Sequence, residues 1–272
     1  MSANHPGEGL LADRSTQFLL RRNTVLEALR GSRRDLRRQW VQDDLGSKQI
    51  GPILEAAAVR RVPLQRASKK RLSDKVQDGS HQGVLLETGP YPYTEVADML
   101  ALAAERGEAP FLLLLDLLHG PQNIGALLRT AEICGVHGVI MQDRRAPDIT
   151  PTVVQFSSGA AEHLLIGQVT NLVQTMTNLQ DQGIWVVGLD IDEDARPFGQ
   201  IDLDMPIALV VGHEGSGLRR LVHDRCDLLV QLPMRGFTES LNAAVAGSIL
   251  LYAAWQARGF EGARTEPRGE SR

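Results

Sequence analysis

Three polar segments contain residue types whose spacing could support chemistry. The first begins at Asp116 and continues through Asn123 and Gly125 to Arg129. An asparagine there can cap a helix, and a glycine lets a backbone approach a ligand closely. An arginine can bind an oxygen-rich group by charge-assisted hydrogen bonds. By position alone, however, Arg129 is more often a surface or ion-paired side chain.

The second and third segments are weaker signals when each is taken alone. Residues 211–217 read VGHEGSG, and their three glycines could cradle a phosphate. They match neither the dinucleotide fingerprint nor the P-loop. Glu214 could contact a ligand or an arginine, although a tight turn explains the glycines equally well. In residues 232–242, Ser240 or Asn242 could simply cap the next helix, which is rich in small residues.

The elements that must position these segments alternate between strand and helix after Pro110. Residues 111–115 are continuously apolar, as expected for a strand buried on both faces. Further strands are predicted at 136–141, 184–189, 207–211 and 228–232, with helices at 124–134, 152–161, 218–226 and 241–256. This pattern predicts an α/β fold with a parallel sheet and helices on both faces. Ligands bind at the carboxyl ends of such strands, where the loops 116–123, 212–217 and 233–240 should meet.

Together, the three segments resemble the motifs of the SpoU (TrmH) family of RNA 2'-O-ribose methyltransferases, part of the SPOUT superfamily. The pattern Asn123-x-Gly125-x-x-x-Arg129 is similar to the first motif, and Val-x-Gly-x-Glu214-x-x-Gly217 to the second. The third runs from Leu-Pro-Met-x-Gly to Ser240-Leu241-Asn242, and the resemblance covers about 110–256. Where the family usually has a serine, this chain has Ala244.

The resemblance implies a fold, a cofactor and roles for residues. It implies a deep trefoil knot in the C-terminal domain, against the general rarity of knots. S-adenosyl-L-methionine would be held by main chain at Gly212, Leu232 and Leu241, with Met234 in the same segment. Arg129 would act on the ribose hydroxyl, and the residues that orient it and the ribose would be Asn123, Glu214, Ser240 and Asn242. A guanidinium keeps its proton in most proteins, which favours electrostatic activation by Arg129 over its acting as a base.

The N-terminal part differs from the rest in charge. Residues 14–87 hold 16 basic and 8 acidic residues, whereas 88–272 hold 13 basic and 23 acidic residues, although the net charge of the whole chain is only −4. A basic domain suits a polyanion such as RNA. The predicted RNA-binding residues are Arg21, Arg22, Arg33, Arg34, Arg37, Arg38, Lys69, Lys70 and Arg71. A solvated charged face is the alternative.

The sequence also predicts domain boundaries. We expect a disordered tail at 1–15, an RNA-binding domain at 16–88, a linker at 89–109, a catalytic domain at 110–258 and a second disordered tail at 259–272. The N-terminal domain resembles the family's L30e-like substrate-binding domain. Its closing segment, His81-Gln82-Gly83-Val84, is similar to that of the 23S rRNA guanosine methyltransferases, which favours guanosine in large-subunit rRNA as the target.

Composition limits the remaining possibilities. Cys134 and Cys226 are expected to be buried reduced thiols, and no cluster has metal-ligand spacing. No signal pattern precedes the first domain, and the uncharged stretch 243–255 is too short to span a bilayer, so we expect a cytoplasmic protein. That stretch is apolar around the whole helix, which predicts a homodimer. The alternatives are a tRNA methyltransferase of the same family, a non-catalytic RNA-binding protein, and a dehydrogenase, which would need a glycine fingerprint that is absent.

Overall fold

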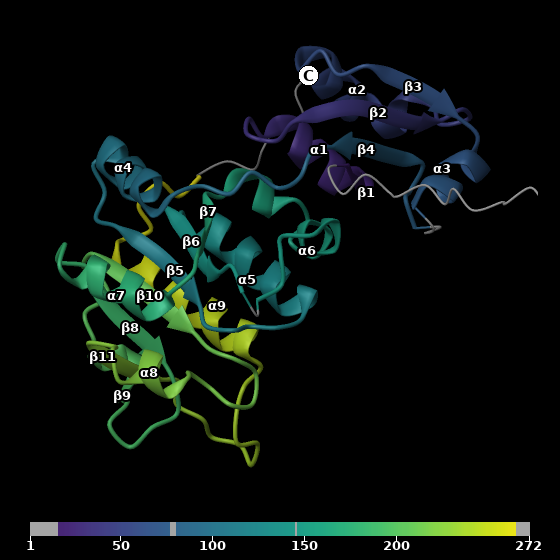
Figure 1. The fold of residues 1–272 in the computed structure, drawn as a ribbon. Helices are drawn as coiled ribbons and strands as arrows, with labels where there is room; N and C mark the ends of the chain where they lie inside the picture. The colour runs from purple at the N-terminus through teal and green to yellow at the C-terminus, as the bar shows by residue number, and fades with distance from the viewer. Residues whose placement is uncertain (1–15, 77–79, 145, 265–272) are drawn as a thin grey trace, which may run out of the picture. The chain divides into compact units, whose positions relative to one another are not determined.

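The computed structural model describes residues 16–76, 80–144 and 146–264. The chain divides between Tyr91 and Pro92 into two compact units, each with its own sheet (Figure 1). The tail predicted at 1–15 lies outside the described residues. Because the two units are separate bodies, each is described by itself.

The first unit contains a four-stranded mixed sheet with the order β1-β4-β2-β3. Its strands are β1 (Gln17–Leu20), β2 (Leu36–Gln42), β3 (Leu64–Ala67) and β4 (Val84–Thr88). Strand β4 is antiparallel to both β1 and β2, and β2 is parallel to β3. The helices are α1 (Arg22–Arg30), α2 (Ser47–Val59) and α3 (Lys69–Val76). Trp40, Leu72 and Leu85 form a buried cluster that joins α3 to the sheet.

The sequence of the first unit predicts its helices and strands only in part. Helix α1 begins at Arg22, and the side-chain oxygen of Gln82 accepts the backbone N–H of Arg22. Strands β1 and β2 were not predicted, because β2 reads LRRQWVQ and has no regular alternation of apolar and polar residues. The β2 segment forms a strand because it pairs with the apolar strand β4, and its own sequence does not indicate this.

The second unit is built on seven strands with the order β7-β6-β5-β10-β8-β11-β9, and every pairing is parallel. The strands are β5 (Phe111–Leu115), β6 (Gly138–Gln142), β7 (Ile166–Val169), β8 (Trp185–Leu189), β9 (Arg196–Pro197), β10 (Ile207–Val211) and β11 (Leu228–Gln231). This confirms the predicted parallel α/β sheet. Strands β7 and β9 were missed because both are short.

Helices cover both faces of this sheet (Figure 1). One layer contains α4 (Val96–Arg106), α7 (Leu172–Gln180) and α8 (Arg220–His223), and the other α5 (Pro121–Ile133), α6 (Pro151–Phe156) and α9 (Ala243–Ala257). Short 3-10 turns follow α6 at Ala160–His163 and β9 at Phe198–Gln200. Alternate residues of β5 point to opposite layers, and Leu112 and Leu114 pack in the cluster that contains Met176 and Val222.

The predicted linker at 89–109 is largely part of the second unit. Helix α4 lies within it, and Met99 is fully buried among residues of the sheet. A side-chain carbon at Gly138 would lie 2.2 Å from the Met99 sulfur, so a glycine makes room for this helix. At the other end, Phe260 packs against Trp255 at a ring-centroid distance of 5.1 Å. The part of the predicted C-terminal tail at 259–264 is therefore ordered against α9, and 265–272 lies outside the described residues.

Candidate active site

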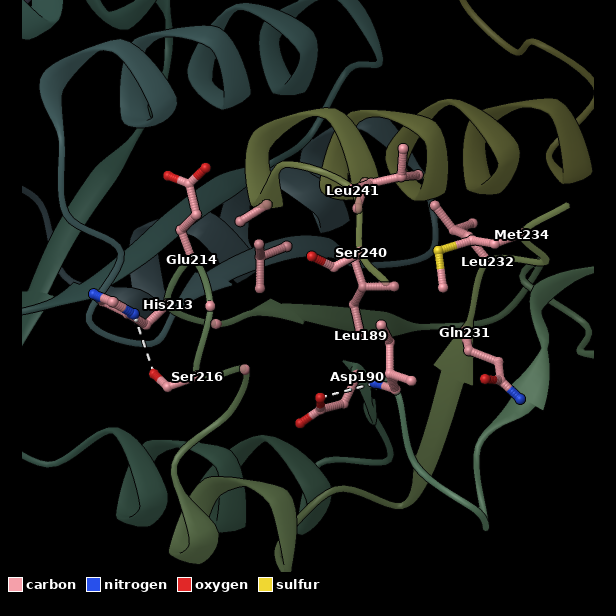
Figure 2. Close-up of a pocket in the computed structure, with 17 residues that line it drawn as sticks. Leu189, Asp190, His213, Glu214, Ser216, Gln231, Leu232, Met234, Ser240 and Leu241 are labelled. Carbon is pink, nitrogen blue, oxygen red and sulfur yellow. Dashed lines mark hydrogen bonds between the residues drawn. The ribbon is translucent and has the colours of Figure 1, made fainter. Parts of the chain in front are cut away.

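A pocket of about 330 Å³ forms where the carboxyl ends of β8, β10 and β11 meet the start of α9. Its lining includes the four predicted cofactor residues, Gly212, Leu232, Met234 and Leu241, together with Ser240 and Glu214. We call it the three-loop pocket (Figure 2). The loops after β10 and β11 meet there as predicted, because parallel strands end at one edge of the sheet. The loop after β5 contributes no lining residue.

Glycines shape the wall of the three-loop pocket. A side-chain carbon at Gly212 would lie 2.4 Å from the carbonyl oxygen of Gly217, which real side chains do not tolerate. Backbone hydrogen bonds of 3.0 and 3.1 Å between His213 and Gly217 close the turn, and Gly217 has a φ of +65°. The three glycines therefore make a tight turn whose backbone borders the pocket.

Two aspartates at strand ends hold this turn in place. Asp116, fully buried at the end of β5, accepts hydrogen bonds from the backbone nitrogen of Arg219 at 2.8 Å and from its side chain at 2.6 Å. Asp190, at the end of β8, accepts one from the backbone nitrogen of Leu218 at 3.1 Å. Neither role was predicted from the sequence. The available signal was their position directly after a buried strand.

Other lining residues of the pocket were also missed. Leu189 ends β8, Asp190 and Ile191 follow it, and Gln231 ends β11. Figure 2 shows Leu189, Asp190 and Gln231 around the pocket. The His213 ring lies near the His119 ring, with centroids 5.5 Å apart, and its Nδ1 is 3.1 Å from the Ser216 hydroxyl. The loop after β8 has no glycine or motif that marks it as part of a site. Its position at the end of a strand was the one signal that could have predicted its place in the pocket.

Three of the predicted catalytic residues form one hydrogen-bonded group. The Asn123 amide donates to Glu214 Oε2 at 2.7 Å, and the Asn242 amide donates to Glu214 Oε1 at 2.7 Å and to Asn123 Oδ1 at 3.1 Å. Asn242 Oδ1 accepts from the backbone nitrogens of Ala244 and Val245 at 3.0 and 3.2 Å, which confirms it as the cap of α9. This group joins α5, α9 and the loop after β10. Two of its hydrogen bonds are to a carboxylate, and such bonds are stronger than hydrogen bonds between neutral groups.

The expected capping role of Asn123 is wrong. Helix α5 begins two residues earlier, at Pro121, with Gly120 as its N-cap. Proline suits the first turn because it has no N–H to leave unpaired. The Asn123 side chain is thereby released from capping and reaches Glu214 and Asn242.

Arg129 lies outside the three-loop pocket. It is exposed on α5 in a hollow of about 970 Å³ that also contains Asn123, Asn242 and the apolar face of α9, and we call this hollow the α9 groove. Its Nη1 lies 3.4 Å from the Ser158 hydroxyl, a long hydrogen bond. The Asn123–Glu214–Asn242 group has members in both hollows, since Glu214 lines the pocket and the two asparagines line the groove.

Gly125 permits a close approach, but to this chain's own backbone rather than to a ligand. A side-chain carbon there would lie 2.5 Å from Phe156 Cβ and 2.8 Å from the backbone nitrogen of Ser157. The segment at 156–158 therefore packs on α5, which brings Ser158 to Arg129. Ser158 has a φ of +55°, a conformation that non-glycine residues seldom adopt. Ala244, which replaces the family's serine, is buried and borders the groove.

Neither cysteine suits chemistry or a disulfide. Both are free; Cys134 is buried and Cys226 half-buried. Burial raises the pKa of each thiol to about 12, so both stay protonated. In the part of the chain that the structure describes, no group of three or more His, Cys, Asp or Glu residues could hold a metal ion. No helix in that part is long and apolar enough to cross a membrane.

Family models match most of the chain. Residues 110–252 match the SpoU rRNA Methylase family, and residues 22–94 match the RNA 2'-O ribose methyltransferase substrate-binding domain. The chain therefore belongs to the SpoU rRNA methylase family, as its motifs predicted, and is an RNA methyltransferase of the SpoU/TrmH class. The first unit is the substrate-binding domain of that class.

Individual relatives agree with this assignment. The chain is 39% identical over 241 residues to YacO of Bacillus subtilis, named as a TrmH family tRNA/rRNA methyltransferase, covering 89% of this chain and 96% of that one. The fold is similar to the SpoU methyltransferase AviRb from Streptomyces viridochromogenes, solved with AdoMet, at a TM-score of 0.75 and 23% identity over 90% and 92% of the two chains. An AdoMet-bound rRNA methyltransferase from Sinorhizobium meliloti gives 0.72 at 20% identity over 89% and 87%.

Proposed function

We propose that this protein methylates the 2'-hydroxyl of a guanosine ribose in 23S (large-subunit) rRNA, with S-adenosyl-L-methionine as the methyl donor. The observation that carries the proposal is the Asn123–Glu214–Asn242 group, which has one member in the three-loop pocket and two in the groove that contains Arg129. Transfer of a methyl group requires that the cofactor and the RNA are held side by side in a fixed geometry. A hydrogen-bonded group shared by the pocket and the groove can provide this.

The three-loop pocket fits the proposed cofactor. Its volume of about 330 Å³ is within the usual range for small-molecule sites. Leu189, Leu232 and Leu241 offer apolar surface for a purine, and the main chain at Gly212 can approach a ligand closely because no side chain intervenes. When bound, the cofactor supplies a methyl group on a sulfonium, which is already a good leaving group.

The protein's own groups then have to align and activate a weakly acidic hydroxyl. Arg129 can donate hydrogen bonds to that hydroxyl oxygen and to the adjoining phosphate, which stabilises the negative charge on the oxygen as the hydroxyl proton passes to water and the methyl group is transferred. Ser158 holds one end of the guanidinium. Asn123 and Asn242 fix the Glu214 carboxylate at the boundary of the two hollows, and Ser240 at the pocket rim can contact the ribose.

The choice of rRNA over tRNA rests on three points. The matching family model is described as an rRNA methylase, the Sinorhizobium meliloti neighbour is named as an rRNA methyltransferase, and His81-Gln82-Gly83-Val84 resembles the closing segment of the 23S enzymes. Mapping of 2'-O-methyl sites in rRNA and tRNA from a strain lacking the gene tests the proposal. We expect one guanosine site in large-subunit rRNA to lose its methyl group and to regain it with the wild-type gene. A site lost only from tRNA would overturn the rRNA target, and no lost site would overturn the function.

We also propose that a second copy of the chain covers the apolar wall of the α9 groove, and that Arg129 and the two asparagines stay accessible to the RNA. Val245 and Tyr252 are each 48% exposed on α9, and Phe156 is 40% exposed on the facing wall, so the groove presents apolar side chains that water disfavours. Light scattering coupled to size exclusion should show a dimer at micromolar concentration. Tyr252→Asp should yield monomers with reduced activity, whereas Leu221→Asp, at a 71% exposed position on α8, should leave the dimer intact. A fully active wild-type monomer would contradict this proposal.

The remaining expectations from the family stay proposals of the same kind. They are the deep trefoil knot around the pocket, the L30e-like architecture of the first unit and a cytoplasmic location, where an assembling ribosome would be found.

A further inference from the structure

The first unit contains a hollow of about 420 Å³ to which the comparisons assign no ligand. We call it the first-unit hollow. Arg22, Gln42, Lys69 and Gln82 border it, although they lie up to 60 residues apart in the sequence. Arg22 is the first residue of α1 and Lys69 the first residue of α3, so two helices begin at its edge. The amino ends of helices favour anions.

The floor of this hollow is rigid. His81 is only 1% exposed, and its Nδ1 accepts the backbone N–H of Gly83 at 2.9 Å while its Nε2 lies 3.2 Å from the Ser73 hydroxyl. Gly83 has a φ of +78°, and a side-chain carbon there would lie 2.3 Å from Leu45 Cδ1. The hollow is therefore formed before any ligand arrives, which lowers the entropic cost of binding.

The two cations at its edge have no carboxylate partner among the described residues. Arg22 donates from Nε to the carbonyl oxygen of Gln82 at 3.3 Å and from Nη2 to the side-chain oxygen of Gln49 at 3.4 Å, and both acceptors are neutral. Lys69 is exposed. Gln42 donates to Asp44 at 2.5 Å, so one carboxylate lies behind this amide. The positive charge of Arg22 is held in place and available to an anion.

Other predicted RNA-binding cations have partners within the first unit. Arg34 is only 4% exposed; it donates to Gln17 at 3.0 Å and to the carbonyl oxygen of Gly89 at 3.2 Å. Arg37 donates to Asp35 at 3.0 Å and to Thr16 at 2.7 Å. Arg38 and Arg71 lie 5.4 and 5.7 Å from the centre of the Trp40 ring, which is 3% exposed and so cannot stack on a base.

We infer that the first-unit hollow binds one unstacked nucleotide of the RNA substrate. Its phosphate lies between Arg22 and Lys69, and the edge of its base lies beside the amides of Gln42 and Gln82. Proteins read RNA mainly at such unpaired nucleotides, with phosphate contacts for position and polar side chains for the base. The inference rests on the proposed function, because it takes the bound polymer to be the methylated RNA.

Two exposed lysines provide a matched test. Lys69 on α3 borders the hollow, whereas Lys48 on α2 does not. RNA binding is measured by filter binding with full-length protein, saturating S-adenosylmethionine and rRNA from the deletion strain, at several salt concentrations. We expect Lys69→Glu to weaken binding about ten-fold and to lower the salt slope by about one, as for the loss of one phosphate contact. Lys48→Glu, with the same charge change, should alter affinity by less than about two-fold.

The base contact is tested separately. Gln42→Ala should raise the KM for RNA several-fold with the salt slope, kcat and cofactor affinity unchanged, because the amide carries no charge. Equal effects of Lys69→Glu and Lys48→Glu would overturn the site and leave only a diffuse basic surface. An unchanged KM in Gln42→Ala would overturn the nucleotide and leave a phosphate contact.

The failure of this inference is distinguishable from failure of the proposed function. Wild-type protein that methylates rRNA while the two lysine variants behave alike refutes the hollow alone. Wild-type protein that methylates no RNA refutes the function, whatever the two variants bind.

Discussion

The two ligand-sized hollows at the centre of these proposals are built from different parts of the polypeptide. The three-loop pocket of the second unit is shaped by main chain, with Gly212 and Gly217 in contact where no side chain could fit. The first-unit hollow is bordered by long side chains, Arg22, Lys69, Gln42 and Gln82, over a rigid turn. A backbone site tolerates almost no change at its glycines, whereas a side-chain site loses affinity in graded steps. In the proposed function, main chain that cannot change therefore holds the cofactor, and side chains that can be exchanged hold the RNA.

Arg129 should show the largest effect, because among the described residues that line the α9 groove it is the only charged one. Arg129→Ala is expected to lower methyl transfer about 10³-fold, the upper end for removing one electrostatic donor, and to leave S-adenosylmethionine affinity within a few-fold. Single-turnover methylation and calorimetry measure the two quantities. Arg220→Ala is the control, since that side chain is 91% exposed on α8. Wild-type turnover in Arg129→Ala would refute both accounts of the mechanism.

Gly212 tests whether the pocket is a backbone site. Gly212→Ala would place a carbon 2.4 Å from the Gly217 carbonyl oxygen, so the turn has to move. We expect cofactor affinity to fall about 100-fold, or about 2.8 kcal/mol, by calorimetry. Gly236→Ala is matched to it, because Gly236 lies in the β11 loop with nothing within 4 Å of the added carbon. If Gly212→Ala binds the cofactor normally, the pocket does not depend on its main chain as described.

Removal of the first unit separates affinity from chemistry. A chain beginning at Pro92 keeps the entire seven-stranded sheet and its core. It should bind RNA about ten-fold or more weakly with a flatter salt dependence, while binding S-adenosylmethionine as before. Filter binding across a salt series measures the slope. An unchanged salt dependence of RNA binding would mean that the RNA contacts lie on the second unit. RNA affinity would then not belong to the first unit.

His137 gives the smallest predicted effect, on stability alone. Its side chain is fully buried; Nδ1 accepts the backbone N–H of Phe111 at 3.0 Å, and Nε2 lies 2.9 Å from Glu108. Desolvation lowers the pKa of His137 below its ordinary value of 6.5, outweighing the opposing effect of Glu108; Arg106 and Arg258 lower it further. The folded state therefore binds fewer protons than the unfolded state near that pH.

The sign of the pH effect follows from that difference. Stability is full above pH 6.5 and falls as the pH drops through 6.5 toward the lowered pKa of His137, by at most about 1.4 kcal/mol per pH unit for one proton. Urea unfolding at pH 7.5 and pH 5.5 measures it, and His137→Asn should have a smaller pH dependence than the wild type. An identical pH dependence in the two proteins would show that His137 stays neutral or is charged in both states.

Those parts of the protein that follow local rules could be predicted from the sequence. Continuous apolar runs such as 111–115 predicted strands buried on both faces, and their alternation with helices predicted the parallel sheet. The order of the three polar segments identified the family, and strand-end position predicted that the loops after β10 and β11 meet. These features follow from periodicity and topology, which a linear sequence carries.

Which side chains meet, and what each one is used for, depends on how the chain packs in three dimensions. Asn123 had the right residue type for a cap, but the helix began earlier and freed it to bind Glu214, 91 residues away. Arg22 and Lys69 border one hollow, whereas Arg34, equally basic in the sequence, is buried by its hydrogen bonds to Gln17 and Gly89. A charge or an amide has no fixed partner along the chain; its role depends on which distant groups the packing of the two cores brings within hydrogen-bond distance.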